Sequence, residues 1–115
     1  MKLSPTIMRA AYDFLRITPP FNRWGLPPGS EVSFKTKASG TARADLAYHY
    51  KVDGKHEIGI SQRKVSHLRP LMETLAHEVC HIRATEQGER SDHGRLFNRA
   101  AMQVCRSLGF DPKHF

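Results

Sequence analysis

The segment 70–84 constrains the fold most, because an apolar stripe and a pair of histidines share one predicted helix. Its apolar residues recur at the spacing of one helix face: Leu71, Leu75, Val79 and Ile82. Among them stands the sequence His77-Glu78-Val79-Cys80-His81. Residues four apart lie one above the other on a helix, so both imidazoles can direct a nitrogen at one metal ion. We therefore predict a helix with one face in the core and a metal site beside it.

Glu78 adds a potential catalytic carboxylate beside this pair of histidines. It is offset from His77 by about 100 degrees of helix rotation, so its carboxylate can reach a water on the metal rather than the metal itself. A zinc ion activates such a water for hydrolysis, and a carboxylate can act as general base and then as general acid. The His-Glu-x-x-His pattern therefore predicts a zinc hydrolase with Glu78 as its catalytic residue.

A third metal ligand must come from elsewhere in the chain, because a catalytic zinc takes three protein ligands and leaves one position open. A metzincin would carry Gly at 84 and His at 87, but this chain has Ala84 and Gln87. We favour His93, because it stands at the start of the next predicted helix and a short loop can fold it back to the metal face. The spacing leaves four alternatives open: Glu86, Glu89, Asp92 and His114.

The first element is predicted to be a helix that starts at Pro5, with Ser4 as its N-cap, and ends at Thr18 before two prolines. We expect its core face to carry Ile7, Ala11, Phe14 and Leu15. A turn-rich stretch follows, in which Trp24 and Leu26 are predicted core anchors.

The middle third of the chain changes from helical to strand-like spacing. Three runs are predicted strands: 31–37, 43–52 and 56–61. Asp53-Gly54 separates the last two and predicts a tight hairpin, because a type I′ turn needs a positive φ at both central residues. We expect a three-stranded, mostly antiparallel sheet.

A last helix is predicted from about His93 to Leu108, with Ser91 or Asp92 as its N-cap and Gly109 just past its end. Its apolar face should carry Leu96, Phe97, Ala100, Ala101, Val104, Cys105 and Leu108. The order of helix, three strands and two helices predicts an α+β fold of one domain over residues 1–115. In this fold the two C-terminal helices carry the metal site.

Composition narrows the functional classes. The 115 residues are 39% apolar, which allows a small core, and no apolar run approaches the ~18 residues that a membrane span needs. The 18 Lys and Arg outnumber the 11 Asp and Glu, and the net charge of +7 favours a polyanion such as DNA as a partner. Cys80 and Cys105 are too few for a disulfide framework, so we expect two buried thiols and a reducing, cytoplasmic setting.

The chain resembles the SprT-like zinc metallopeptidase domain, the family that includes the Spartan DNA–protein crosslink proteases. One match is the His-Glu-x-x-His motif with its lead-in, from Leu71 to His81. The other is His93-Gly94-Arg95-Leu96-Phe97, which is similar to the family's downstream His-Gly-x-x-Phe. The run Ile58-Gly59-Ile60-Ser61 resembles the strand that precedes the active-site helix. The resemblance covers most of residues 1–110.

This resemblance implies a minimal zincin fold in which His77, His81 and His93 bind Zn²⁺ and Glu78 is the catalytic acid and base. It also implies a protein or peptide substrate, with DNA-associated proteins as a candidate class. The sequence stops at Phe115 without the cysteine-rich zinc ribbon that many members carry. We therefore expect a minimal form, from a bacterium or a phage.

Two other functions stay open from the sequence: a nucleic-acid-binding module with a structural zinc, and a zinc hydrolase that acts on a non-peptide bond. An oxyanion needs a further hydrogen-bond donor, for which the sequence offers Tyr48, His49, Arg95 and Asn98 without a choice among them. We also expect that an extended peptide could pair with the strand at 58–61.

Overall fold

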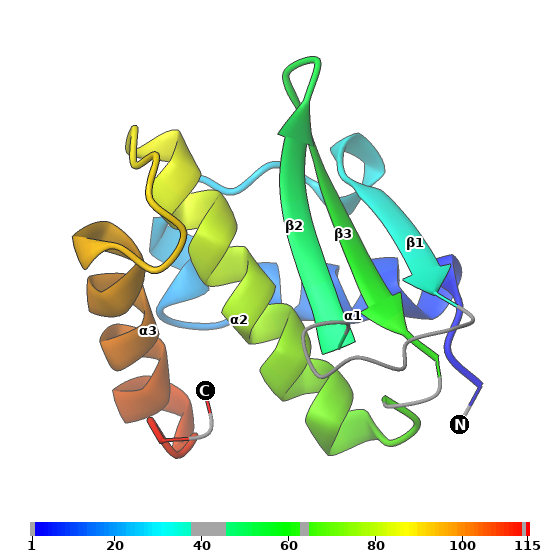
Figure 1. Cartoon of the computed structure of the whole chain (residues 1–115). Helices are drawn as coiled ribbons and strands as arrows, with labels where there is room; N and C mark the ends of the chain where they lie inside the picture. Colours follow the sequence, from blue (N-terminus) through cyan, green and yellow to red (C-terminus); the bar gives the residue numbers. More distant parts are fainter. Residues whose placement is uncertain (1, 38–45, 63–64, 114) are drawn as a thin grey trace.

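The computed structural model describes residues 2–37, 46–62, 65–113 and 115. Its main elements are α1 (Pro5–Arg16), β1 (Ser33–Lys37), β2 (Ala47–Val52), β3 (Lys55–Ser61), α2 (Leu68–Glu86) and α3 (Arg95–Leu108). Two short 3₁₀ helices, η1 (Phe21–Arg23) and η2 (Gly29–Glu31), connect α1 to β1. The predicted α+β class is confirmed (Figure 1). The first part of the predicted strand 43–52, at 43–45, lies outside the described residues.

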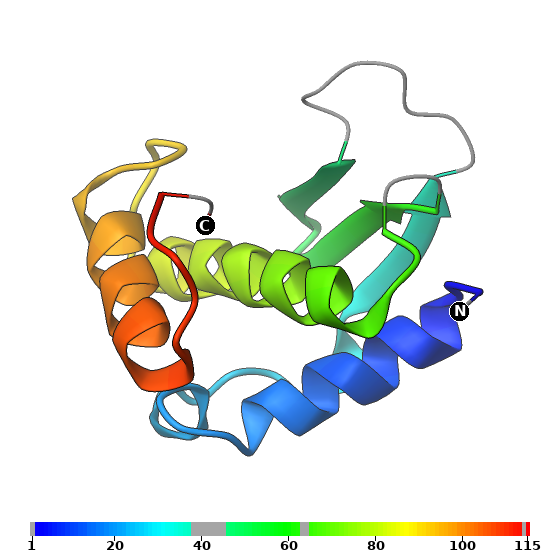
Figure 2. The same ribbon diagram turned by 90° about the horizontal axis from the view of Figure 1, so that it is seen from below.

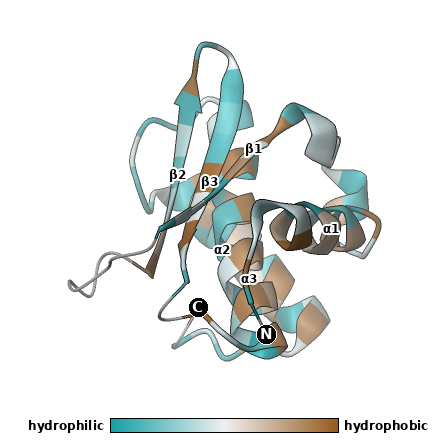
Figure 3. Cartoon of the chain, turned by 90° about the vertical axis from the view of Figure 1, so that its right-hand side faces the viewer, coloured by the Kyte–Doolittle hydropathy of each residue, from teal (hydrophilic) through white to brown (hydrophobic). Residues whose placement is uncertain are grey.

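The helices gather on one side of the sheet, with α2 at the centre of the molecule (Figures 2 and 3). Helix α2 contacts α1, α3, β2 and β3, so it is enclosed on several sides at once. The apolar stripe predicted for it is confirmed, because all four side chains are fully buried: Leu71, Leu75, Val79 and Ile82. The opposite side of α2 is left for the histidine pair.

The sheet is mixed, with the order β1-β3-β2. β2 pairs with β3 in antiparallel fashion through the predicted Asp53-Gly54 turn, where φ is 52° and 77°. β1 pairs with β3 in parallel, whereas we expected a mostly antiparallel sheet. The turn determines only the β2–β3 pair, and β1 takes the remaining side of β3. Because β3 is paired on both sides, the expectation that a peptide pairs with the strand at 58–61 is wrong.

Helix α1 begins as predicted, since the Ser4 hydroxyl accepts a hydrogen bond from the backbone N–H three residues on, at 3.2 Å. Its buried side chains are Met8, Tyr12 and Leu15. The placement of Phe14 in the core is wrong, because its residue is 58% exposed and lies about 100 degrees around the helix from Leu15. Tyr12 takes the core position instead, and its hydroxyl donates to the carbonyl of Pro27 at 2.6 Å. Burial raises the pKa of Tyr12.

The other core predictions are confirmed. Trp24 and Leu26 are buried, and the Trp24 ring lies under the Arg83 guanidinium, 5.4 Å from the ring centroid. Cys80 and Cys105 are buried free thiols, and burial raises the pKa of both. None of the described helices is long and apolar enough to cross a lipid bilayer.

Candidate metal centre

Three imidazoles converge beside α2. His77 and His81 project from one face of α2, and His93 comes from the loop before α3. One ring nitrogen from each lies within 4.8 Å of the others, and the Nε2 atoms of His81 and His93 are 3.2 Å apart. The three histidines are thus positioned to bind a metal ion.

The structure describes three of the four alternatives to His93, and none of these three belongs to the metal-binding cluster. Glu86 is engaged by His56 and Lys51, and Glu89 binds the start of α3. Asp92 is highly exposed, with a carboxylate oxygen 3.9 Å from His81 Nδ1. His114 lies outside the described residues. Of the residues that the structure describes, the three histidines form the one cluster with a metal-binding arrangement.

Outer contacts orient the imidazoles. His77 donates from Nδ1 to the backbone carbonyl of Phe115 at 3.0 Å, which leaves Nε2 free for a metal. Burial lowers the pKa of His77, and it lowers the pKa of His81 to about 4. Both rings are therefore neutral near pH 7, and neutral imidazole is the form that binds metals.

Phe97 packs its ring against all three histidines. The centroid distances are 5.0 Å to His77, 4.3 Å to His81 and 4.5 Å to His93. The ring is 4% exposed and stands one turn into α3. It therefore forms an apolar surface that limits how the three imidazoles can turn.

Glu89 determines where α3 begins, and thereby where His93 lies. Its two carboxylate oxygens accept from the backbone N–H groups of Leu96 at 2.8 Å and Phe97 at 2.9 Å. The predicted cap at Ser91 or Asp92 is wrong, because Gly94 is the N-cap residue and Glu89 supplies the side-chain oxygens. A Cβ at Gly94 would collide with the Glu89 carboxylate, so the glycine makes room for this contact.

Glu78 is the unusual group of the site. Its residue is 4% exposed, and its Oε2 is one of two buried side-chain polar atoms in the described chain that lack a hydrogen-bond partner. Burial, with a smaller contribution from the charge of Asp92, raises the pKa of Glu78 to about 8. A buried, unpartnered carboxylate is costly alone. A nearby cation with its water would satisfy it, so the residues present fit a divalent metal such as zinc.

The sequence also matches the model of a known protein family. The model of the SprT-like family matches residues 14–114, which is nearly the whole chain and includes every residue of the histidine cluster. The chain belongs to the SprT-like family. No curated protein and no solved structure matches it. Membership of the SprT-like family is consistent with a zinc-metallopeptidase-like domain.

Two cavities open the SprT-like site to ligands. One, of about 760 Å³, is lined by His77, Glu78, His81 and His93 together with β2 residues. The second, of about 480 Å³, is lined by His77 and Glu78 together with residues that include Leu46, Thr74 and Phe115. Glu78 lines both cavities.

In the structure of this SprT-like domain, the four candidates for oxyanion stabilisation differ in their hydrogen-bond partners and in their exposure. The Tyr48 hydroxyl donates to Glu57 at 2.9 Å, and burial, together with this hydrogen bond, raises the pKa of Tyr48 to about 12. Its ring covers Gly59, where a Cβ would collide with it. Arg95 is exposed on α3, and exposed Asn98 donates to the His93 carbonyl at 3.4 Å. Of the four, His49 alone is both half-buried in the larger cavity and stacked on a cluster histidine.

Sequence reasoning missed two contributors to the SprT-like centre. Glu89 was considered only as a ligand, although a carboxylate five residues before a helix glycine could have signalled a cap. The Phe115 carbonyl has no signal in the sequence at all, because any residue carries one.

Proposed function

We propose that this SprT-like domain is a zinc-dependent endopeptidase. The observation that carries the proposal is the unpartnered Oε2 of Glu78, buried beside three convergent imidazoles. His77, His81 and His93 would hold the Zn²⁺, which when bound supplies Lewis-acid chemistry: it acidifies a water and polarises a carbonyl.

Glu78 would accept the proton of the attacking water and then deliver it to the leaving amine. A carboxylate that burial makes more basic is better suited to this role than an exposed one, because proton transfer is most efficient near the working pH. Phe97 excludes solvent beneath the imidazoles, and Phe115 keeps the His77 ring in one orientation.

The outer edge of β2 is the place for the peptide. β2 is an edge strand that lines the larger cavity from Ala47 to Lys51. Alternate residues of an edge strand leave their backbone groups free, so an extended peptide can pair there. This edge replaces the strand at 58–61 that we had expected from the sequence.

A purely structural zinc would have no use for Glu78. A closed structural site takes four ligands and buries no free carboxylate beside them. The 4% exposure and missing partner of Glu78 therefore favour the enzyme over the nucleic-acid-binding module.

We further propose proteins on DNA as the substrate class. The basic residues Arg95, Arg99 and Arg106 are exposed along α3, the helix that follows the His93 loop. Added to the net charge of +7, they offer phosphate contacts along α3. DNA binding should then weaken steeply with added salt.

The test compares wild type with Glu78→Gln on casein and on histone, with and without single-stranded DNA. We expect Glu78→Gln to bind one zinc as wild type does and to lose about 10²- to 10⁴-fold in cleavage rate. Glu57→Gln, on the far face of the sheet, is the matched control and should keep full activity. Circular dichroism of each sample checks that chelation has not unfolded the domain.

Equal cleavage by wild type and Glu78→Gln would refute the peptidase. The wild type could instead leave proteins intact and hydrolyse a simple ester in a reaction that depends on Glu78. This outcome would favour a hydrolase of non-peptide bonds.

A further inference from the structure

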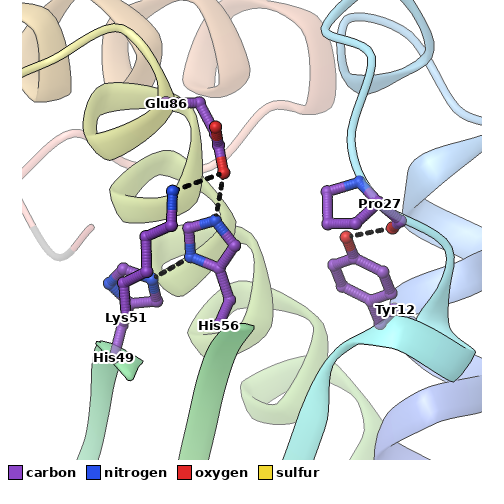
Figure 4. A network of polar contacts seen from close by, with 6 residues as sticks. All are labelled: Tyr12, Pro27, His49, Lys51, His56 and Glu86. Atoms are coloured by element: carbon purple, nitrogen blue, oxygen red, sulfur yellow. Dashed lines mark hydrogen bonds and ion pairs between the residues drawn. The ribbon is translucent and has the colours of Figure 1, made fainter. Parts of the chain in front are cut away.

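A second series of polar contacts runs from β2 through β3 to the end of α2 (Figure 4). His49 Nε2 and His56 Nδ1 are 2.8 Å apart, and His56 Nε2 lies 2.5 Å from Glu86 Oε1. His56 is 3% exposed, whereas the Glu86 side chain is 49% exposed and also lies 3.5 Å from Lys51 Nζ. This series therefore links the surface at Glu86 to the cavity wall at His49.

His49 is the end of this series that reaches the cavity. Its ring stacks on that of His81 with 4° between the planes and 6.0 Å between the centroids. One nitrogen, Nε2, is used by His56. The other, Nδ1, has no hydrogen-bond partner in the described chain and is not among its buried unpartnered atoms. Nδ1 is therefore not fully buried, and it belongs to a residue that lines the larger cavity.

The donor and acceptor groups along this series determine which ring nitrogen of each histidine carries a proton. A carboxylate only accepts, so His56 must donate from Nε2 to Glu86. This hydrogen bond lowers the pKa of Glu86, which keeps it ionised. With its one proton on Nε2, the His56 ring presents a bare Nδ1, which accepts from the Nε2–H of His49. The Nδ1 of His49 is left as a hydrogen-bond acceptor at the cavity.

We propose that His49 contacts the substrate, that its Nδ1 accepts a hydrogen bond from an N–H of the bound peptide, and that Glu86 fixes this tautomer through His56. His49 is the substrate-contacting residue, and His56 and Glu86 are positioning residues. The proposal rests on the peptidase function proposed above and adds to it a recognition contact on the β2 side of the cavity.

Packing alone does not account for this arrangement. An apolar pair would fill the space between the sheet and α2 without the desolvation cost of a buried His56. The other face of the same strands offers a comparison, since Tyr48 of β2 donates there to Glu57 of β3. That hydrogen bond involves none of the cluster histidines, and Glu57 lines neither cavity of the site, so Glu57 is the control residue.

The first test is kinetic, on the zinc-loaded protein with a casein-derived fluorogenic peptide. His49→Phe keeps a flat ring on His81 but removes both nitrogens, and we expect about a tenfold rise in KM from the loss of one hydrogen bond. His49→Asn, whose amide oxygen can replace Nδ1, should recover part of the loss. Glu57→Gln, at a residue that lines neither cavity of the site, should leave KM unchanged.

The positioning role predicts non-additivity. Glu86→Ala should raise KM severalfold in wild type. It should have no further effect in the His49→Phe background, because the series of hydrogen bonds from Glu86 then no longer reaches the substrate. Zinc content and unfolding midpoint are measured for every variant. An unchanged KM in His49→Phe, or additive effects of the two substitutions, would overturn the proposal.

The second test does not need activity. Long-range ¹H–¹⁵N NMR spectra of the zinc-loaded protein should show His49 as the Nε2–H tautomer, and Glu86→Ala should mix the two tautomers. A His49 that carries its proton on Nδ1 in wild type contradicts the assignment. If wild type cleaves no peptide, the proposed function and the substrate contact fail together, while the spectra still decide whether Glu86 sets the tautomer of His49.

Discussion

Gly94→Ala should destabilise the domain through a single neighbour, the carboxylate of Glu89. The backbone at Gly94 has φ −83° and ψ −166°, which alanine adopts without strain. The added Cβ would lie 2.6 Å from Glu89 Cδ and nearer still to Oε1. The carboxylate must therefore leave the two N–H groups that it accepts from at the start of α3.

The cost follows from the loss of this cap. A side-chain cap contributes about 0.5–2 kcal/mol and a negative charge at a helix N-terminus about 0.3–1 kcal/mol more. We therefore expect a loss of about 2 kcal/mol in the free energy of unfolding for Gly94→Ala. In a domain of this size, that loss lowers the melting temperature by about 10 °C. Zinc affinity should fall as well, because His93 stands directly before Gly94.

A double-mutant cycle in urea isolates the mechanism. Glu89→Ala alone should cost about 2 kcal/mol, and adding Gly94→Ala to it should cost almost nothing, since no carboxylate remains to be displaced. The Cβ of Ser91, 3.1 Å from the new methyl group, is present in both backgrounds and cancels. Equal costs of Gly94→Ala with and without Glu89 would refute this explanation.

Three further predictions concern stability. In the metal-free protein, the raised pKa of Glu78, about 8 against 4.5, means that the folded state retains a proton that the unfolded state releases. The free energy of unfolding of wild type, relative to Glu78→Gln, should fall by up to about 1.4 kcal/mol per pH unit between about pH 5 and 8; a difference that is constant with pH in urea titrations would contradict this. Tyr12→Phe removes the hydroxyl that donates to Pro27 and should cost about 1 kcal/mol in the same titrations. Gly59→Ala places a methyl group in the Tyr48 ring and should cost about 1–3 kcal/mol, part of which Tyr48→Ala should restore in thermal melts.

Local patterns predicted the parts of this fold that local physics determines. The α2 stripe, the Ser4 cap and the Asp53-Gly54 turn each depend on a few neighbouring residues, and all three are confirmed. The pairing of β1 with β3 is a contact between distant segments, which no turn sequence specifies. Tyr12 and Phe14 are both large and aromatic, so only the true orientation of α1 against the sheet shows which one is buried.

The candidate site likewise combines parts that local sequence determines with parts that depend on contacts between distant segments. His77 and His81 are one helical turn apart, and their convergence follows from helix geometry alone. The approach of His93 depends on the course of the loop before α3, and Glu89 controls that course through contacts that a sequence pattern does not display. A carboxylate in a loop can bind a metal, cap a helix or face water, and only the chain path decides among these roles.

A metal bound by the three imidazoles would make the attachment of α3 to α2 depend on the concentration of free metal. Among the described elements, α3 makes its main contacts with α2, and the three imidazoles bridge the same two elements. A metal bound there would act as a removable crosslink and would add RT ln(1 + [M]/Kd) to the free energy of unfolding, about 2.7 kcal/mol at a hundredfold excess over Kd. When metal becomes scarce, amide exchange along α3 should accelerate before that of the sheet, so the third helix would report the level of free metal around the protein.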